Sequence, residues 1–196
     1  MISISKKYLG IDIKRCKFLG KGREGRVYLT SEGYALKIFN NKSSCKSQYN
    51  ILKKVEGSKY FPKAIEMSDK CMLREYIEGI ALYDYVKKRG LSKDIGIKLI
   101  ELLEEFRRLG FTRIDISSKN IYIESGGDIK VIDPRKSYSK KRDIPRMLLR
   151  ELEALGVLDE FIKVTLEVRP NLVVKWINAI NKLSRIACKN VRKSSA

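Results

Sequence analysis

The sequence predicts an α+β protein with two lobes: a β-rich N-terminal lobe over about residues 1–77 and a mainly helical C-terminal lobe over about residues 78–196. Two observations predict this division. In the first part, short apolar runs alternate with glycine-containing turns, which is typical of antiparallel hairpins. Beyond Glu78-Gly79, apolar residues recur at the three- and four-residue spacing of amphipathic helices. A length of 196 residues suits a single domain whose two lobes share one cleft.

The N-terminal lobe is expected to be an antiparallel sheet with one helix. Ser-Glu-Gly at residues 31–33 is a tight hairpin signal between two apolar runs. Tyr49, Leu52 and Val55 recur at helical spacing. The expected elements are strands at Arg15–Gly20, Arg26–Thr30, Tyr34–Phe39, Ala64–Met67 and Cys71–Tyr76, and a helix at Ser44–Val55.

The C-terminal lobe is expected to be mainly helical and truncated. Ser92 is placed to cap its longest helix, which Gly110 ends. Residues 125–128, Ser-Gly-Gly-Asp, predict a hairpin, and the chain from residue 143 onward is expected to be helical with breaks near Gly156 and Pro170. The expected elements are a helix at Ala81–Arg89 and strands at Ile121–Glu124 and Ile129–Ile132. Trp176, Ile177, Ile180 and Leu183 are expected to form a buried apolar stripe; alternatively, this stripe receives a partner.

The composition narrows the chemistry that the chain can perform. It has no histidine, which excludes His-based triads and imidazole general bases. With 42 basic and 23 acidic residues, the net charge of +19 would attract an anionic partner, such as RNA, a phosphoprotein, an acidic protein or a membrane surface, and does not choose between them. For any single basic cluster, a solvated helical face is the alternative. The basic residues are densest in Arg135–Arg150, and the tail Lys189–Lys193 is also basic. No C-x-x-C pair occurs, so buried reduced thiols are expected for Cys16, Cys45, Cys71 and Cys188.

A glycine-rich motif and a lysine lie in the predicted sheet. Gly20, Gly22, Gly25 and Val27 form the pattern G-x-G-x-x-G-x-V, and glycines allow backbone N–H groups to approach phosphate oxygens. A dinucleotide-binding fold would need a helix directly after this loop, but a strand follows. Lys37, 12 residues after Gly25, is placed to reach the phosphates of a nucleotide. A plain glycine-rich hairpin and a solvent-facing lysine are the alternative interpretations.

Two acids and an amide follow in the second half of the chain. Asp115 and Asn120 are five residues apart, between a predicted helix and a predicted hairpin. The acid can orient a hydroxyl group or accept its proton, and the amide can hold a metal ion. Asp133 ends an apolar strand, where its carboxylate can bind Mg²⁺ that bridges two phosphates. Alternatively, each acid is a turn residue or a helix cap.

In order and spacing, these motifs resemble those of the protein-kinase family over roughly Lys14 to Arg135. The resemblance implies a bilobal protein-kinase-like fold and an ATP-dependent phosphotransferase that uses Mg²⁺ or Mn²⁺. It implies that Asp115 is the catalytic aspartate, that Lys37 pairs with the phosphates, and that Asn120 and Asp133 hold the metal. The other implied cofactor-binding residues are Gly20, Gly22 and Gly25 over the phosphates, Val27, Ala35 and Tyr122 around adenine, Glu75 and Ile77 as the hinge backbone, and Gln48 beside Lys37.

Several positions depart from the family pattern. Gln48 stands where the family carries a glutamate that pairs with the strand lysine. Arg74 occupies a usually apolar position, from which it could reach the nucleotide, reach Asp133 or turn outward. Arg-Ile-Asp at 113–115 stands in place of the usual H-R-D triplet and lacks its middle arginine, which in the family binds a phosphate on the activation loop. Asp-Pro-Arg at 133–135 stands in place of the usual D-F-G triplet. This reduced site resembles small atypical kinases, namely the RIO kinases and the kinase subunit of the complex that makes threonylcarbamoyl-adenosine on tRNA.

The leading functional hypothesis is a serine/threonine protein kinase that acts on a protein or on itself. Candidate acceptors in the chain are Ser137, Tyr138 and Ser139. The alternatives are a nucleotide-binding pseudokinase scaffold, which Gln48 and Arg74 favour, and a kinase of small molecules. No apolar run is long enough to span a membrane, so no membrane span and a cytoplasmic location are expected.

Overall fold

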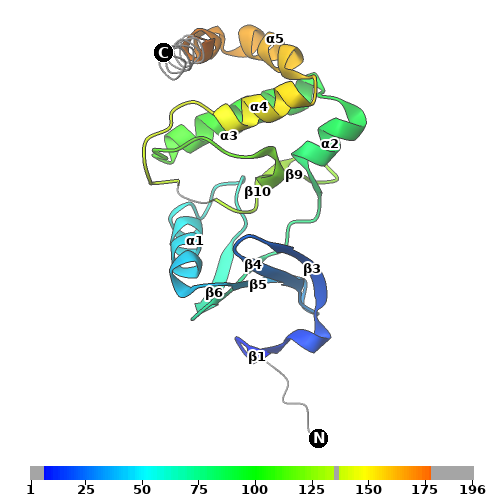
Figure 1. Ribbon diagram of the computed structural model, residues 1–196, viewed down its shortest axis with the longest axis vertical. Coiled ribbons are helices and arrows are strands. Elements are labelled where there is room, and N and C mark those ends of the chain that lie inside the picture. The colour runs from blue at the N-terminus through cyan, green and yellow to red at the C-terminus, as the bar shows by residue number, and fades with distance from the viewer. Residues whose placement is uncertain (1–6, 135–136, 178–196) are drawn as a thin grey trace, which may run out of the picture. The chain divides into compact units, whose positions relative to one another are not determined.

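The computed structural model describes residues 7–134 and 137–177 (Figure 1). It combines helices with antiparallel sheets, which confirms the predicted α+β class. The described residues divide into two compact units. One contains residues 7–82, 119–134 and Ser137, and the other contains residues 83–118 and 138–177. The two-lobed kinase arrangement stays a prediction. Several features singled out above lie outside the described residues, namely Arg135, Lys136, Ile180, Leu183, Cys188 and Lys189–Lys193.

A five-stranded antiparallel sheet in the order β3-β4-β5-β7-β6 lies in the first unit. The strands are β3 (Lys17–Gly22), β4 (Gly25–Leu29), β5 (Tyr34–Phe39), β6 (Ala64–Ser68) and β7 (Cys71–Glu75). A ribbon of β1 (Lys7–Tyr8) and β2 (Ile11–Asp12) and a 3-10 turn, η1 (Ile13–Arg15), precede them. Val27 lies opposite Lys37, and Ala35 lies opposite Arg74. Since directly opposed residues and residues two apart along a strand project to one face, these four side chains share a face of the sheet.

The helix α1, Lys42–Lys54, packs on β5, β6 and β7 (Figure 1). The side chain of Asn41 accepts a hydrogen bond from the Ser44 N–H at 2.8 Å. This N-cap starts the helix two residues before the predicted start. The helix buries Cys45, Gln48, Ile51 and Leu52. It therefore brings Gln48 to the sheet.

A three-stranded antiparallel sheet in the order β10-β9-β8 also belongs to the first unit. β9 (Ile121–Ile123) and β10 (Ile129–Val131) form the predicted hairpin, which follows the 3-10 turn η2 (Ser118–Asn120). β8 (Ile80–Ala81) was not predicted, because two residues carry no periodic signal. Its approach to β9 requires Gly79, where a Cβ would lie 2.4 Å from the Ile123 carbonyl oxygen.

The second unit is mainly helical. Its helices are α2 (Leu82–Arg89), α3 (Lys93–Arg108), α4 (Arg146–Ala154) and α5 (Leu158–Val168), and residues 170–177 are helical as well. The Ser92 hydroxyl accepts a hydrogen bond from the Ile95 N–H at 3.3 Å, which confirms the predicted N-cap. α3 and α5 approach closely at Gly96, where a Cβ would lie 3.2 Å from a Val164 methyl group. No helix in the part of the chain that the structure describes is long and apolar enough to cross a bilayer.

An aromatic pair forms part of the core of the second unit. The rings of Phe161 and Trp176 stack with their centroids 5.9 Å apart, and both residues are 0% exposed. Val173 lies three residues before Trp176 and is also buried. Ile177 is 46% exposed, so its prediction as a core residue is wrong. Each helical residue is rotated by about 100° from its neighbour, and this step carries Ile177 off the face shared by Val173 and Trp176.

Three of the four cysteines lie within the described residues, and these three are free thiols. Cys45 and Cys71 are buried, as expected, whereas Cys16 is partly exposed. Burial raises the pKa of the Cys45 thiol to about 11. Cys45 therefore stays protonated at neutral pH and serves as a small core residue.

Candidate functional site

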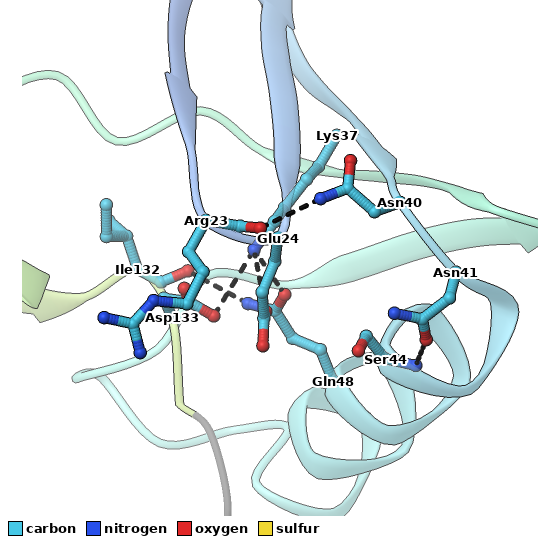
Figure 2. Close-up of polar contacts among 9 residues, drawn as sticks. All are labelled: Arg23, Glu24, Lys37, Asn40, Asn41, Ser44, Gln48, Ile132 and Asp133. Carbon is cyan, nitrogen blue, oxygen red and sulfur yellow. Dashed lines mark hydrogen bonds and ion pairs between the residues drawn. The ribbon is translucent and has the colours of Figure 1, made fainter.

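Lys37 is the centre of a buried charge cluster in the first unit. It lies on the central strand β5 and is 7% exposed. Its Nζ donates a hydrogen bond to Gln48 Oε1 at 2.8 Å, and it lies 3.4 Å from Asp133 Oδ1 and 3.7 Å from Glu24 Oε2 (Figure 2). Burial lowers the pKa of Lys37 below its usual range, and the two carboxylates oppose that shift. The cluster therefore holds an ammonium group in a poorly solvated place beside two acids and one amide.

Glu24 is a partner of Lys37 that the motif analysis did not single out. It lies in the turn between β3 and β4, and this turn is tied to the end of β5 by Asn40. The Asn40 N–H donates to the Glu24 carbonyl at 2.8 Å, and its side-chain amide donates to the Arg23 carbonyl at 2.9 Å (Figure 2). Gln48, which replaces the expected glutamate, leaves Lys37 with a neutral helix partner. Glu24 and Asp133 supply the negative charge instead.

The three motif glycines differ in what the fold requires of them. A Cβ at Gly25 would lie 1.9 Å from the Ile38 carbonyl oxygen, so the pairing of β4 with β5 excludes any larger residue. A Cβ at Gly20 or at Gly22 would meet nothing within 4 Å. Packing therefore explains Gly25 but leaves open space at the other two glycines, which a ligand could fill.

This difference predicts a large loss of stability for one alanine substitution and almost none for another. Gly25→Ala is expected to destabilise the fold by about 2–4 kcal/mol, because strand backbone must move to relieve the clash. Gly22→Ala is expected to change the unfolding free energy by less than about 0.5 kcal/mol. Urea denaturation of the two variants measures both values. Equal losses at the two positions would show that packing also requires Gly22.

A cavity of about 520 Å³ lies within the first unit. The predicted residues that line it are Gly20, Gly22, Gly25, Val27, Lys37, Ile77, Asn120, Tyr122 and Asp133. Other lining residues are Leu19, Lys21, Arg23, Glu24, Arg74, Tyr76, Lys119 and Ile132. Ala35, Gln48 and Glu75 are not among the lining residues, although Gln48 contacts the cavity residue Lys37. Ala35 is fully buried in β5, next to Arg74 on β7.

Asn120 and Asp133 are donors that suit a magnesium ion bound together with phosphates. The Ile132 N–H donates to the Asn120 carbonyl at 3.0 Å, which holds the two segments side by side. Within residues 7–134 and 137–177, no group of three or more acidic, cysteine or histidine side chains could hold a metal ion. Mg²⁺ sites for nucleotides need only one or two protein oxygen ligands, since phosphates and water supply the others. The donor set therefore fits a metal that arrives with a nucleotide.

Arg74 points into the protein. It is 5% exposed and lines the cavity, which excludes the outward orientation considered above. Its Nη1 donates a hydrogen bond to the Glu75 carbonyl at 2.7 Å. Its Nε is buried and has no hydrogen-bond partner among the described residues. Burial lowers the pKa of Arg74 to about 10, and Asp133 opposes this shift.

Asp115 belongs to the second unit, whereas the other predicted site residues belong to the first. Its side chain is 4% exposed, and Oδ1 accepts a hydrogen bond from the Met147 N–H at 2.7 Å. Oδ2 lies 3.5 Å from Arg113 and 3.6 Å from Arg142. Because α4 begins at Arg146 and has no side-chain cap of its own, Asp115 acts as its N-terminal acceptor. This bond is the helix-cap role that sequence reasoning left open as an alternative.

The loop after Asp115 is also attached to α4. Glu151 accepts hydrogen bonds from the Ser117 hydroxyl at 2.8 Å and from the Ser118 backbone N–H at 2.6 Å. The Ser118 hydroxyl donates to the same carboxylate at 2.7 Å. Together with the bond from Met147, these contacts fix the backbone on which Asp115 is carried. Sequence spacing could not reveal them, because the partners are more than 30 residues apart.

Parts of the chain are similar to curated proteins that are named as kinases. YrzF of Bacillus subtilis, provisionally named a serine/threonine-protein kinase, is 32% identical over 59% of this chain and 56% of its own length. Mitogen-activated protein kinase kinase 10 of Arabidopsis thaliana is 26% identical over 62% of this chain and 45% of its own length. MARK-C of Dictyostelium discoideum, provisionally named in the same class as YrzF, is 28% identical over 60% of this chain and 18% of its own length. No protein-family model matches the chain.

These relatives support a protein-kinase-like superfamily for the chain and a kinase-like phosphotransferase as its class. The chain spans about half the length of each of the first two relatives and 18% of the length of the third. The finer resemblance to RIO kinases and to the tRNA-modification kinase subunit stays a prediction.

Proposed function

We propose that the chain is an ATP-dependent phosphotransferase that acts on serine or threonine hydroxyl groups of a protein, including itself. The observation that carries this proposal is the buried Lys37 ammonium, held beside Asp133 in a cavity that the glycine-bearing hairpin lines. Phosphoryl transfer requires mainly positioning and neutralisation of charge, and this cavity supplies groups for both. The names of the curated relatives support the same class.

Each part of the cavity then has a task. The open space at Gly20 and Gly22 admits phosphates close to backbone N–H groups, and Lys37 neutralises phosphate charge. Asn120 and Asp133 would hold Mg²⁺ or Mn²⁺, which supplies further charge neutralisation when bound. Val27, Ala35 and Tyr122 would pack on the base, and the backbone of Glu75 and Ile77 would bond its edge. Gln48 orients Lys37.

The proposed role of Asp115 rests on its spacing to Asn120. As in the kinases that the sequence resembles, Asp115 would orient the acceptor hydroxyl and accept its proton. Of the candidate acceptors in the chain, Ser137 is 4% exposed, whereas Ser139 is exposed. Ser139 is therefore the better candidate for autophosphorylation. A cytoplasmic location and an anionic partner, RNA or an acidic protein, remain part of the proposal.

One observation favours a second function, a nucleotide-binding scaffold without transfer activity. Both oxygens of Asp115 already have partners in the second unit, and its side chain is 4% exposed. A carboxylate that only caps α4 would explain these contacts. In that case the chain binds nucleotide but transfers no phosphoryl group.

The test is transfer of labelled phosphate from millimolar ATP, with Mg²⁺ or Mn²⁺, to a general acceptor protein and to the chain itself. Lys37→Met is expected to lower transfer at least about 100-fold, because it removes the cation that faces the phosphates. Lys46→Met removes an exposed lysine of α1 and is expected to leave transfer unchanged. Nucleotide binding without transfer in the wild-type chain would favour the scaffold. Equal transfer by the two variants would refute the proposed role of Lys37.

A further inference from the structure

Arg74 introduces a cation into the part of the cavity where the proposed function places the base. Its side chain shares a face of the sheet with Val27, Ala35 and Lys37. It lines the cavity together with Tyr76, Ile77 and Tyr122. Of its donors, Nη1 is bonded to the Glu75 carbonyl, and the buried Nε has no partner among the described residues. A buried donor without an acceptor is costly, so a ligand that brings an acceptor to this guanidinium gains affinity.

The Glu75 carbonyl is the second part of the argument. In the proposed nucleotide site, the hinge backbone bonds the edge of a purine base, and the 6-amino group of adenine is a donor that needs a backbone carbonyl. Arg74 Nη1 already donates to the Glu75 carbonyl at 2.7 Å. Glu75 itself does not line the cavity, but an adenine amino group that reached its carbonyl would meet a guanidinium donor and an oxygen that already accepts one hydrogen bond. A purine with an oxygen at position 6 would instead present an acceptor to the guanidinium.

We propose that the cavity prefers purine nucleotides with an oxygen at position 6 of the base, as in guanine and hypoxanthine, and that Arg74 determines this preference. The inference rests on the proposed function only in that a purine nucleotide occupies the cavity. It changes the base that the kinase resemblance alone would indicate. Burial lowers the pKa of Arg74 to about 10, in keeping with a guanidinium that solvent reaches poorly.

The test begins with the affinity of the full wild-type chain for four nucleotides, measured by calorimetry with Mg²⁺ and non-hydrolysable triphosphates. Guanosine and inosine forms are expected to bind on the order of 10- to 100-fold more tightly than the adenosine form. The inosine form isolates position 6, because it lacks the 2-amino group of guanine. The 2-aminopurine form has no substituent at position 6 and is expected to bind less tightly than the guanosine form by a similar factor.

Arg74→Met is expected to reverse the order, so that the adenosine form binds more tightly than the guanosine form. The substitution removes the buried charge, keeps an unbranched apolar stem and frees the Glu75 carbonyl for an amino group. Arg26→Met is the matched control: it removes one positive charge from β4, where Arg26 lies opposite Ile38 and projects away from the Lys37 face. This control is expected to keep the preference of the wild-type chain.

The outcomes separate this inference from the proposed function. Equal affinities for the adenosine and guanosine forms, or tighter binding of adenosine, would overturn the role of Arg74 while the chain remains a nucleotide-binding protein. No binding of any nucleotide would overturn both proposals. If Arg74→Met does not fold, the ratio of inosine to adenosine affinity in the wild-type chain still decides whether the preference exists, and Arg74→Lys, which keeps the charge but loses the guanidinium, tests whether Arg74 determines it.

Discussion

Asp115→Asn is expected to lower phosphoryl transfer on the order of 10³-fold while changing the unfolding free energy by less than about 1 kcal/mol. The amide cannot accept the hydroxyl proton, but its oxygen can still accept the Met147 N–H bond that starts α4. Asparagine and aspartate are equally good helix caps. The lost ion pair with Arg142 is worth little, because Arg142 is 46% exposed and its charge is screened by solvent. The pair with Arg113, whose side chain is 20% exposed, accounts for most of the remaining loss.

Asp115→Ala separates catalysis from capping. It removes the acceptor as well as the charge, so it is expected to destabilise the fold by about 1–2 kcal/mol in addition to abolishing transfer. Labelled-phosphate transfer and urea denaturation of both variants give the two readouts. Full transfer by the asparagine variant would leave Asp115 with a structural role alone, and unchanged stability of the alanine variant would refute the capping bond.

The largest expected effect on stability comes from Phe161→Ala. The ring is 0% exposed and stacks on Trp176, so its removal is expected to cost about 3–5 kcal/mol of unfolding free energy. Much of this loss arises because a cavity remains: close-packed neighbours such as α3 cannot move far enough to occupy the space of the ring. Chemical denaturation followed by the fluorescence of Trp176, the single tryptophan in the chain, measures the change.

Leu166→Ala is the matched control on the same helix. Leu166 is 48% exposed, and its truncation is expected to change the unfolding free energy by less than about 0.5 kcal/mol. A loss at Leu166 as large as the loss at Phe161 would mean that an additional surface covers this side of α5.

Local signals predicted most elements of the fold. The strand Tyr34–Phe39 has the bounds expected from its apolar run and the turn before it, and Ser92 caps α3 as its residue type indicates. Neighbouring residues determine these features, so they can be predicted from a single sequence. β8 was missed because two residues become a strand only through pairing with β9, a tertiary contact. Ile177 was misplaced because an apolar stripe does not reveal which of two adjacent residues faces the core.

The candidate site shows the same division between local and distant information. The glycine motif, the strand position of Lys37 and the place of Asp133 just after an apolar strand could be read from the sequence, and the fold brings these residues to one cavity. The ion pair with Glu24 and the inward course of Arg74 could not be predicted, because each depends on the direction of a side chain across the sheet. The bond from Asp115 to α4 joins residues 32 positions apart and leaves no periodic trace.

If a nucleotide occupies the proposed site, Glu24 makes its binding an exchange of one anion for another. Its carboxylate lies 3.7 Å from Lys37 Nζ, so a phosphate that reaches Lys37 competes with an anion belonging to the chain. The measured affinity of the nucleotide would then be the difference between two interaction free energies: that of Lys37 with the phosphate and that of Lys37 with the Glu24 carboxylate. Because Glu24 is carried on the turn that Asn40 ties to β5, displacement of its carboxylate would also pull on that tie. Displacement of Glu24 by a phosphate is therefore expected to shift the glycine-bearing hairpin as well.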